Sequence, residues 1–336
     1  MTITDSFYDV SLAQLIDDHD VVHIYRHTNP DPDAIGAAAG LAEIIDTNFS
    51  RTLVRLAGDD TLDMRALPDA RFDPPREDDY TLRVLAIVVD TANRTRIDGD
   101  GYTRADTVVK LDHHPVNQLD EEYTYADFEH VNTGASSASE VVTTLATHFE
   151  WEVSKRAAHF LYVGLLGDTG AFSYNTHPST FATAATLAAT GIDVVAIKQA
   201  TATRTAAQVA AYGYVAQDMA HFDESAGFHL TGISDVIMEH HGFNAADAHG
   251  AVNAARNMDG LLAWAVAIEQ TDAEDGRPYF RVSLRSNGPK INHVASHFGG
   301  GGHPLAAGCT VAVGELDTVR ELLAKAVVSY RAEQED

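Results

Sequence analysis

His27, Asp31 and Asp33 lie within seven residues of one another, between a strand-like run and a helix-like run. Two prolines stiffen the turn that carries them. Because Asp31 and Asp33 are two positions apart, an extended loop can point them in different directions, one carboxylate toward each of two cations. Asp33 alone is typical of a helix N-cap, whereas the imidazole together with two carboxylates favours a metal site.

Further polar residues follow three other apolar runs. Asp90 ends the run VLAIVVD, and ligands of open α/β sheets bind at the carboxyl ends of strands; it could bridge two metals or simply start a turn. Asp112, His113 and His114 follow the next run. One imidazole can bind metal and the other reach toward substrate, with Asp112 orienting a ring. Asp168 is flanked by glycines that permit close approach of a ligand, although alone it is more typical of a loop turn.

A last motif lies near the carboxyl end, where Ser283–Asn287 precedes four consecutive glycines and a histidine. Glycine amides can form an anion-binding nest, and an arginine can clamp a phosphate with two hydrogen bonds. The alternative is a flexible loop between a helix and a strand. We predict that this segment binds substrate through Arg285, Asn287, Gly300, Gly301, Gly302 and His303.

The elements that must position the first motifs alternate between strands and helices. Strand-like runs are followed by helix-like segments, which is typical of a parallel α/β sheet. The segment 154–166 is ambiguous, because its run FLYVGLL fits a helix or a buried strand. We predict strands at 21–25, 52–56, 82–89 and 107–111, and helices at 34–45, 141–149 and 154–166.

The second half begins with an alanine-rich segment, 196–224, that we predict to be a linker helix between a catalytic domain, 1–195, and a substrate-binding domain, 225–336. This smaller α/β domain is predicted to contain strands at 228–233, 261–269, 279–285 and 309–313, and helices at 245–258, 290–298 and 316–330.

Composition narrows the class of protein. The 336 residues are 45% hydrophobic, enough for about two globular domains with buried cores. The single cysteine, Cys309, excludes a disulfide framework and a thiolate metal cluster. No apolar run approaches the ~18 residues of a membrane span, and the first ten residues are too acidic and polar for a secretory signal. We expect a soluble cytoplasmic protein that does not bind membranes.

The net charge of −26 comes with only five lysines. This pattern favours a salt-rich cytoplasm, as in a halophile, over an ordinary acidic protein, because salt screens the self-repulsion. The same negative field repels nucleic acid, so we expect no binding of duplex DNA without a local basic groove.

Taken in order, these motifs resemble those of the DHH phosphoesterase superfamily. The segment HTNPDPDAIG is similar to its first motif, Asp90 to its second, DHHP at 112–115 to its third, and DTG at 168–170 to its fourth. The GGGGH loop resembles the DHH-associated domain, and with the chain length it favours the nanoRNase and pAp phosphatase branch. Departures at Pro32, Ala37 and Gly167 remove no type of ligand.

The resemblance implies two domains with an active-site cleft between them. It implies that one metal is held by His27, Asp31 and Asp90, and a second by Asp33, Asp90, His113 and Asp168. Mn²⁺ suits this mixture of carboxylates and imidazoles, with Mg²⁺ or Co²⁺ as alternatives. A hydroxide activated by the two ions would attack phosphorus. His114 would contact the phosphate or assist the leaving oxygen, and Arg285 and His303 would bind another part of the substrate.

The leading prediction is therefore a Mn²⁺-dependent phosphoesterase that acts on short RNA, dinucleotides such as pApA, or adenosine 3′,5′-bisphosphate (pAp). A RecJ-like single-strand exonuclease is the first alternative, but such enzymes need a long basic, aromatic groove, and the sequence offers only isolated arginines. An inorganic pyrophosphatase fits the glycine-rich loop poorly. A nucleotide sensor without turnover fits poorly as well, because all six candidate ligands are present. A homodimer is possible for this architecture.

Overall fold

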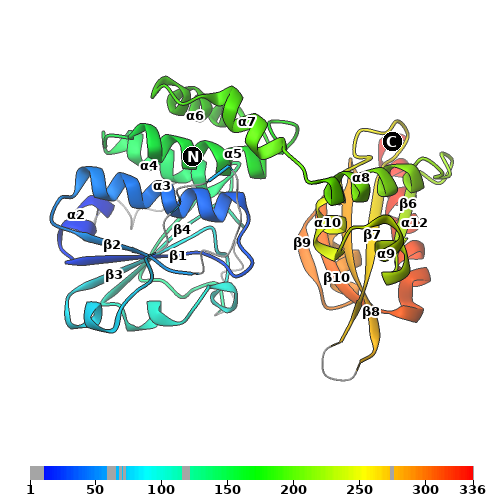
Figure 1. Ribbon diagram of the computed structural model, residues 1–336, viewed down its shortest axis with the longest axis horizontal. Coiled ribbons are helices and arrows are strands. Elements are labelled where there is room, and N and C mark those ends of the chain that lie inside the picture. The colour runs from blue at the N-terminus through cyan, green and yellow to red at the C-terminus, as the bar shows by residue number, and fades with distance from the viewer. Residues whose placement is uncertain are drawn as a thin grey trace. The chain divides into compact units, whose positions relative to one another are not determined.

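The computed structural model describes residues 11–58, 66–67, 70, 73–115, 122–272 and 276–335. The chain divides into two compact units, Met1–Thr203 and Arg204–Asp336 (Figure 1). The first ten residues, where we expect no secretory signal, lie outside the described part of the chain.

The first unit is built on a five-stranded parallel sheet with the strand order β2-β1-β3-β4-β5. This confirms the predicted parallel α/β fold. The predicted strands match within two residues at each end, and the additional edge strand β5 is only four residues long. The strands are β1 (Val21–Tyr25), β2 (Leu53–Leu56), β3 (Val84–Val89), β4 (Thr107–Asp112) and β5 (Phe128–Val131).

Helices cover one face of this sheet, where α3 and α4 pack on the strands and α5 packs on α3 and α4 (Figure 1). The ambiguous segment 154–166 is a helix. The helices are α2 (Leu12–Asp17), α3 (Pro32–Asn48), α4 (Ala138–His148), α5 (Lys155–Asp168), α6 (Pro178–Ala189) and α7 (Val194–Ala202). Short 3-10 turns are η1 (Glu77–Thr81), η2 (Arg94–Arg96) and η3 (Gly101–Arg104).

Glycines allow α3 and α5 to approach closely. A Cβ atom at Gly36 would lie 2.5 Å from the carbonyl oxygen of Phe160, and one at Gly164 would lie 2.7 Å from Asp33 Oδ1. Any larger side chain at these two positions would push the helices apart. The contact therefore brings the first turn of α3, with Asp33, beside the last turns of α5, which ends at Asp168.

The second unit is a smaller α/β domain, as predicted, around a mixed sheet with the order β6-β7-β8-β10-β9. Only β6 and β7 pair in parallel; the other pairs are antiparallel. The strands are β6 (Phe228–Ile233), β7 (Ala263–Thr271), β8 (Pro278–Ser286), β9 (Gly301–His303) and β10 (Ala306–Ala312). The helices are α8 (Ala206–Met219), α9 (Asp235–His241), α10 (Ala245–Gly250), α11 (Asn292–His297), α12 (Leu316–Glu335) and the 3-10 turn η4 (Val313–Glu315).

The predicted linker helix over 196–224 is wrong, because the chain leaves the helix between α7 and α8. Thr203 is extended, with φ −68° and ψ 129°, and Thr205 starts α8 with a capping box to Gln208. Such a box satisfies amides that a continuous helix would engage itself. The predicted helix 245–258 likewise ends at Gly250 and continues as turns, because glycine is a poor helix former.

Within the described residues, no single helix has the length and apolar composition to cross a membrane. Helices α6 and α7 reach that length and composition only when they are taken together, and the chain bends by 114° between them.

Candidate metal centre and substrate pocket

The six predicted metal ligands come together in the first unit. Strands β1, β3 and β4 are neighbours in the sheet, and the strand order reverses between β1 and β3. Ligands of such sheets bind outside the carboxyl ends of the strands at this switch point. His27 and Asp31 follow β1, Asp90 follows β3, and His113 follows β4.

The ligand atoms of the six residues form two groups in which every atom lies within 4.8 Å of the others: His27 with Asp31 and Asp90, and Asp33 with His113 and Asp168. Asp90 and His113 form a further group of this kind with His114. Asp90 faces both groups. Its Oδ2 lies 3.5 Å from His27 Nε2, and its Oδ1 lies 3.4 Å from His113 Nε2. This is the arrangement of a carboxylate that can bridge two metal ions.

Asp31, not Asp33, is the N-cap of α3. Its Oδ1 accepts hydrogen bonds from the amides of Asp33 and Ala34, at 2.9 and 3.0 Å. Its Oδ2 lies 3.9 Å from His27 Nε2. One carboxylate therefore both starts the helix and presents an oxygen to the first group of ligands.

Asp33 is fully buried and is held by the N-terminus of α4. Its two oxygens accept hydrogen bonds from the amides of Ala138 and Ser139, at 2.6 and 3.0 Å. The positive end of a helix stabilises a carboxylate, but burial and the charges of Asp90 and Asp168 outweigh this effect and raise the pKa of Asp33 well above its ordinary value.

The imidazoles compensate only part of the negative charge in this cluster, because burial and the charges of Asp90 and Asp168 raise the pKa of Asp31 to about 6. Burial alone would lower the pKa of His113, but the carboxylates of Asp168 and Asp90 raise it to about 12. Burial alone would raise the pKa of Asp90, but His113 and His27 outweigh it and hold that pKa well below the ordinary value. Protonated histidines thus supply part of the positive charge that the carboxylates require.

The donor set fits divalent metal ions. Asp90 Oδ1 and His113 Nε2 are buried and have no hydrogen-bond partner among the described residues. Buried polar atoms without partners are costly, and ions between them would satisfy both. Carboxylates mixed with imidazoles, without a thiolate, suit hard or borderline cations.

His114 is oriented by Asp112, as the sequence predicts. His114 Nδ1 lies 2.9 Å from Asp112 Oδ1, and the same oxygen accepts a hydrogen bond of 2.8 Å from the His113 amide. Burial lowers the pKa of His114, but Asp112 outweighs it, so that the pKa is raised. The imidazole is therefore held in one orientation, and Asp112 favours its protonated form.

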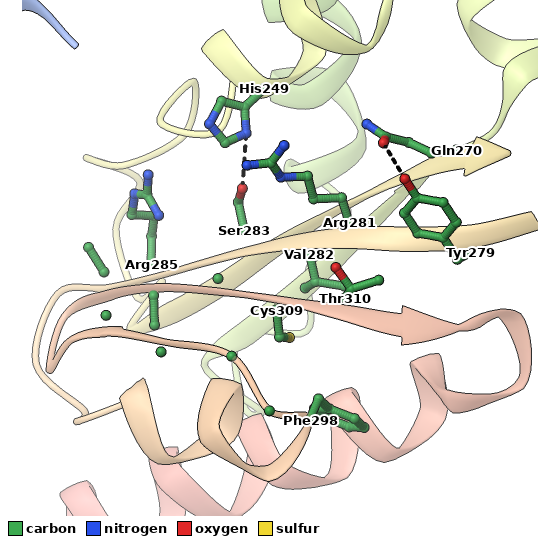
Figure 2. A pocket seen from close by; sticks show the side chains of 17 residues that line it. His249, Gln270, Tyr279, Arg281, Val282, Ser283, Arg285, Phe298, Cys309 and Thr310 are labelled. Atoms are coloured by element: carbon green, nitrogen blue, oxygen red, sulfur yellow. Dashed lines mark hydrogen bonds between the residues drawn. The ribbon is translucent and has the colours of Figure 1, made fainter. Parts of the chain in front are cut away.

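A pocket of about 610 Å³ lies in the second unit, over strands β8 and β10 (Figure 2). Arg281, Ser283 and Arg285 line it from alternate positions of β8, so their side chains share one face of the sheet. His249, from α10, forms a hydrogen bond of 3.2 Å with Ser283 Oγ. Partial burial and the charges of Arg281 and Arg285 lower the pKa of His249.

Four of the predicted substrate residues line this pocket, and two do not. Arg285 and the three glycines from Gly300 to Gly302 are part of its wall. Asn287 instead donates hydrogen bonds to the carbonyl oxygens of Arg256 and Leu261, so its amide holds a loop. His303 is exposed at the end of β9 and is not in the pocket wall.

The glycines also have a packing role that sequence reasoning did not predict. A Cβ at Gly300 would lie 2.2 Å from the carbonyl oxygen of Gly308, and Gly302 has φ +139°. The amides of Gly299 and Gly300 donate to the carbonyl oxygens of Ser296 and Ala295. Those two amides are therefore engaged within the chain, which leaves only part of the run for an anion nest.

Sequence reasoning missed Arg281, Ser283 and His249. The first two were detectable, because residues 281, 283 and 285 alternate along a predicted strand and must face the same side. His249 was not, because it reaches the pocket from a separate helix 34 residues before its partner Ser283.

Comparisons with known proteins agree with the division of the chain into two units. Residues 21–165 match the family model "DHH family, N-terminal domain", and residues 231–329 match the "DHHA1 domain". The probable bifunctional oligoribonuclease and PAP phosphatase NrnA of Streptococcus mutans is 37% identical over 297 residues, which cover 86% of this chain and 89% of that protein. The chain belongs to the DHH family. It is a phosphoesterase of the branch that contains the NrnA proteins.

Two further comparisons place this DHH protein more closely. The bifunctional oligoribonuclease and PAP phosphatase NrnA of Bacillus subtilis is 31% identical over 305 residues, or 89% of this chain and 92% of that one. An exopolyphosphatase-related protein from Bacteroides fragilis shares the fold, with a TM-score of 0.79 at 22% identity over 99% of both chains. DHH-family membership identifies the enzyme as metal-dependent, in agreement with the acidic and histidine cluster.

Proposed function

We propose that this DHH phosphoesterase hydrolyses short oligoribonucleotides, dinucleotides such as pApA, and adenosine 3′,5′-bisphosphate. The observation that carries the proposal is the pair of Asp90 oxygens, one directed at His27 and the other at His113. The substrate class is supported by the similarity to the NrnA proteins of Streptococcus mutans and Bacillus subtilis, which are described as bifunctional oligoribonucleases and PAP phosphatases.

Two divalent cations, Mn²⁺ in our proposal, would be held by His27, Asp31 and Asp90 on one side and by Asp33, Asp90, His113 and Asp168 on the other. When bound, such ions neutralise phosphate charge and lower the pKa of water. The residues of the chain supply the geometry: α4 fixes Asp33, and the cap of α3 fixes Asp31.

His114 is proposed to act on the leaving group. Asp112 fixes the imidazole through Nδ1, so that the ring is held in one orientation for contact with a substrate oxygen. Asp112 raises the pKa of this imidazole against the effect of burial, which favours the protonated form that can give a proton to the departing oxygen. The side chain is 22% exposed, enough for a substrate to reach it.

The pocket in the second unit is proposed to bind a phosphate or terminal nucleotide of the substrate. Arg281 and Arg285 offer charged donors on one face of β8, and guanidinium groups match phosphate oxygens in pairs. We keep His303 as a proposed substrate residue that contacts parts of the substrate outside this pocket.

The test is hydrolysis of pAp, pApA, a five-nucleotide RNA and a thirty-nucleotide single-stranded DNA, each with Mn²⁺, Mg²⁺ or Co²⁺. We expect fast cleavage of the short substrates with Mn²⁺ and little cleavage of the long strand. Processive degradation of the long strand would replace the proposal with a RecJ-like exonuclease. Binding of pAp without turnover in any metal would indicate a nucleotide sensor.

We also propose that the protein works in a salt-rich cytoplasm, because a net charge of −26 is combined with five lysines. Salt screens repulsion between surface carboxylates. The assay should therefore be run in 0.1 and 2 M KCl, and higher activity and melting temperature in 2 M KCl are the expected results. Equal values at both concentrations would contradict this part of the proposal.

A further inference from the structure

Asp90 has an unusual backbone. It follows the buried strand β3 with φ +52°, in the left-handed region that residues other than glycine seldom adopt, although aspartate and asparagine tolerate it better than most. Such a conformation costs on the order of 1–3 kcal/mol and persists only where the surroundings enforce it. The residue that faces both ligand groups is therefore held in place by its neighbours.

Each of the three residues after β3 is tethered through its backbone. The amide of Asp90 donates to the carbonyl oxygen of Leu111 at 3.0 Å. The Tyr125 hydroxyl donates to the carbonyl oxygen of Thr91 at 2.7 Å, and Lys110 Nζ donates to that of Ala92 at 2.8 Å. Two of the three tethers are side-chain groups, which substitution can remove one at a time.

Lys110 is the unusual member of this set. Of the five lysines in the sequence it alone is fully buried, with 0% exposure. Burying an ammonium group is costly unless its hydrogen bonds are satisfied. Nζ also donates to the carbonyl oxygen of Tyr123 at 3.3 Å and lies 5.1 Å from the centre of the Tyr125 ring. The buried ammonium group thus holds the backbone of two loops in place through the carbonyl oxygens of Ala92 and Tyr123.

Both side chains lie outside the ligand groups. Neither belongs to the sets of groups that could hold a metal ion, and both contact the chain one or two residues after Asp90. Lys110 and Tyr125 also touch each other, so they act on the loop as one unit. Their hydrogen bonds with the loop go to the backbone carbonyl oxygens of Thr91 and Ala92, which are not among the predicted metal ligands.

We propose that Lys110 and Tyr125 are positioning residues that hold the loop 90–92 so that the two Asp90 oxygens remain directed at separate metal ions. The inference rests on the proposed two-metal function. Loss of either tether lets Asp90 relax to an ordinary backbone conformation and turn one oxygen away. The expected defect is in binding of the second ion and in kcat, more than in KM.

The test uses the full chain with Tyr125→Phe, which removes one oxygen atom, and with Lys110→Met. Calorimetric Mn²⁺ titration and Mn²⁺ electron paramagnetic resonance are measured together with hydrolysis of bis-p-nitrophenyl phosphate. In wild type we expect two bound ions with an exchange-coupled spectrum. In each variant we expect the weaker ion to bind about 10–100-fold less tightly, as for other residues that orient ligands, with loss of the coupled signal.

Tyr80→Phe is the matched control, because the Tyr80 hydroxyl also donates to a backbone carbonyl oxygen, that of Gly101, at 3.2 Å. That loop carries no predicted ligand, so this variant should lose stability but keep both ions and the coupled spectrum. If Lys110→Met fails to fold, Tyr125→Phe decides the question alone.

The possible outcomes distinguish failure of the positioning role from failure of the proposed two-metal function. If wild type binds two ions and Tyr125→Phe binds them as tightly as Tyr80→Phe does, the positioning role is wrong and the proposed function stands. If wild type binds a single ion, the two-metal function fails and the inference fails with it.

Discussion

His113 is buried among carboxylates, whereas His249 lies at an exposed position in the wall of the β8 pocket, and their pKa values move in opposite directions. In the first unit the carboxylates of Asp168 and Asp90 overcome burial and raise the pKa of His113 to about 12. In the second unit burial and the charges of Arg281 and Arg285 lower the pKa of His249.

The contrast shows that the two regions differ in electrostatic character, in the directions that the proposed metal ions and the proposed anionic substrate would require. The acidic cluster already carries protons that a metal cation can displace. The β8 pocket keeps its histidine uncharged beside two guanidinium groups, and a bound anion would favour protonation. The net charge of −26 is therefore not spread evenly over the protein, because Arg281 and Arg285 place positive charge in the β8 pocket.

The largest expected effect comes from Asp90, the residue that faces both ligand groups. Asp90→Ala should lower kcat for pAp by roughly 10³-fold or more, because the metal contribution is several kcal/mol. Circular dichroism and calorimetric Mn²⁺ titration should show a folded protein that has lost metal binding. Asp90→Asn, which tolerates the left-handed backbone, is the control for folding. Substantial activity in Asp90→Ala would remove the bridging role.

A substitution at the α3–α5 contact should weaken metal binding without replacing any of the proposed ligands. In Gly164→Ala the new Cβ would lie 2.1 Å from Ser139 Oγ and 2.7 Å from Asp33 Oδ1. Displacement of Asp33 should lower Mn²⁺ affinity by about 10–100-fold, as measured by calorimetry. Gly213→Ala in α8 meets nothing within 4 Å and should instead stabilise the helix by up to ~1 kcal/mol. Equal Mn²⁺ affinity in both variants would contradict this.

Substitutions in the β8 pocket should affect substrate binding, and hence KM, more than the chemical step. Arg281→Met and Arg285→Met should each raise KM for pApA by about 10-fold, because a hydrogen bond to a charged group contributes ~1.5–3 kcal/mol. Neither should change kcat/KM for bis-p-nitrophenyl phosphate. His303→Ala should act in the same direction but more weakly, since His303 is not in the pocket wall. Equal effects on both substrates would argue against a substrate role for the pocket.

The smallest effect is the pH dependence, and it should have opposite signs in the two regions. Metal binding requires neutral imidazole, so Mn²⁺ affinity should fall as the pH is lowered from 8 to 5.5. The lowered pKa leaves His249 neutral at pH 7; a bound anion raises that pKa, so sulfate affinity should increase, by less than about tenfold, below pH 6.5. His249→Gln should abolish the second trend only. Calorimetric titration of both probes between pH 5.5 and 8 tests the comparison.

Much of the first region could be predicted because it follows local rules. Apolar runs place strands, and the polar residues directly after them must lie at one edge of a parallel sheet. The strand Val21–Tyr25 has the predicted bounds, and the six residues predicted as ligands lie together. Their role as ligands, and the role of His114, remain predictions that the proposed experiments address.

What could not be predicted depends on contacts between distant segments. No local pattern reveals that Asp33 is held by amides 105 and 106 residues away, or that Asn287 holds the loop near Arg256. The predicted helix over 196–224 failed because composition indicates helix content but not where capping interrupts it. The glycine run suggested an anion nest, whereas close strand approach also requires glycine at Gly300.

The grip of α4 on Asp33 has a consequence for sequence variation in the family. Position 33 and the first turn of α4 form one functional unit split across the chain, because the two amides and the two carboxylate oxygens satisfy one another. A lineage that loses the acid at position 33 leaves buried amides without acceptors, and selection then acts on α4 as well. Substitutions at position 33 and in the first turn of α4 should therefore be correlated among family members. Family members that keep the acid at position 33 should keep small residues at the start of α4.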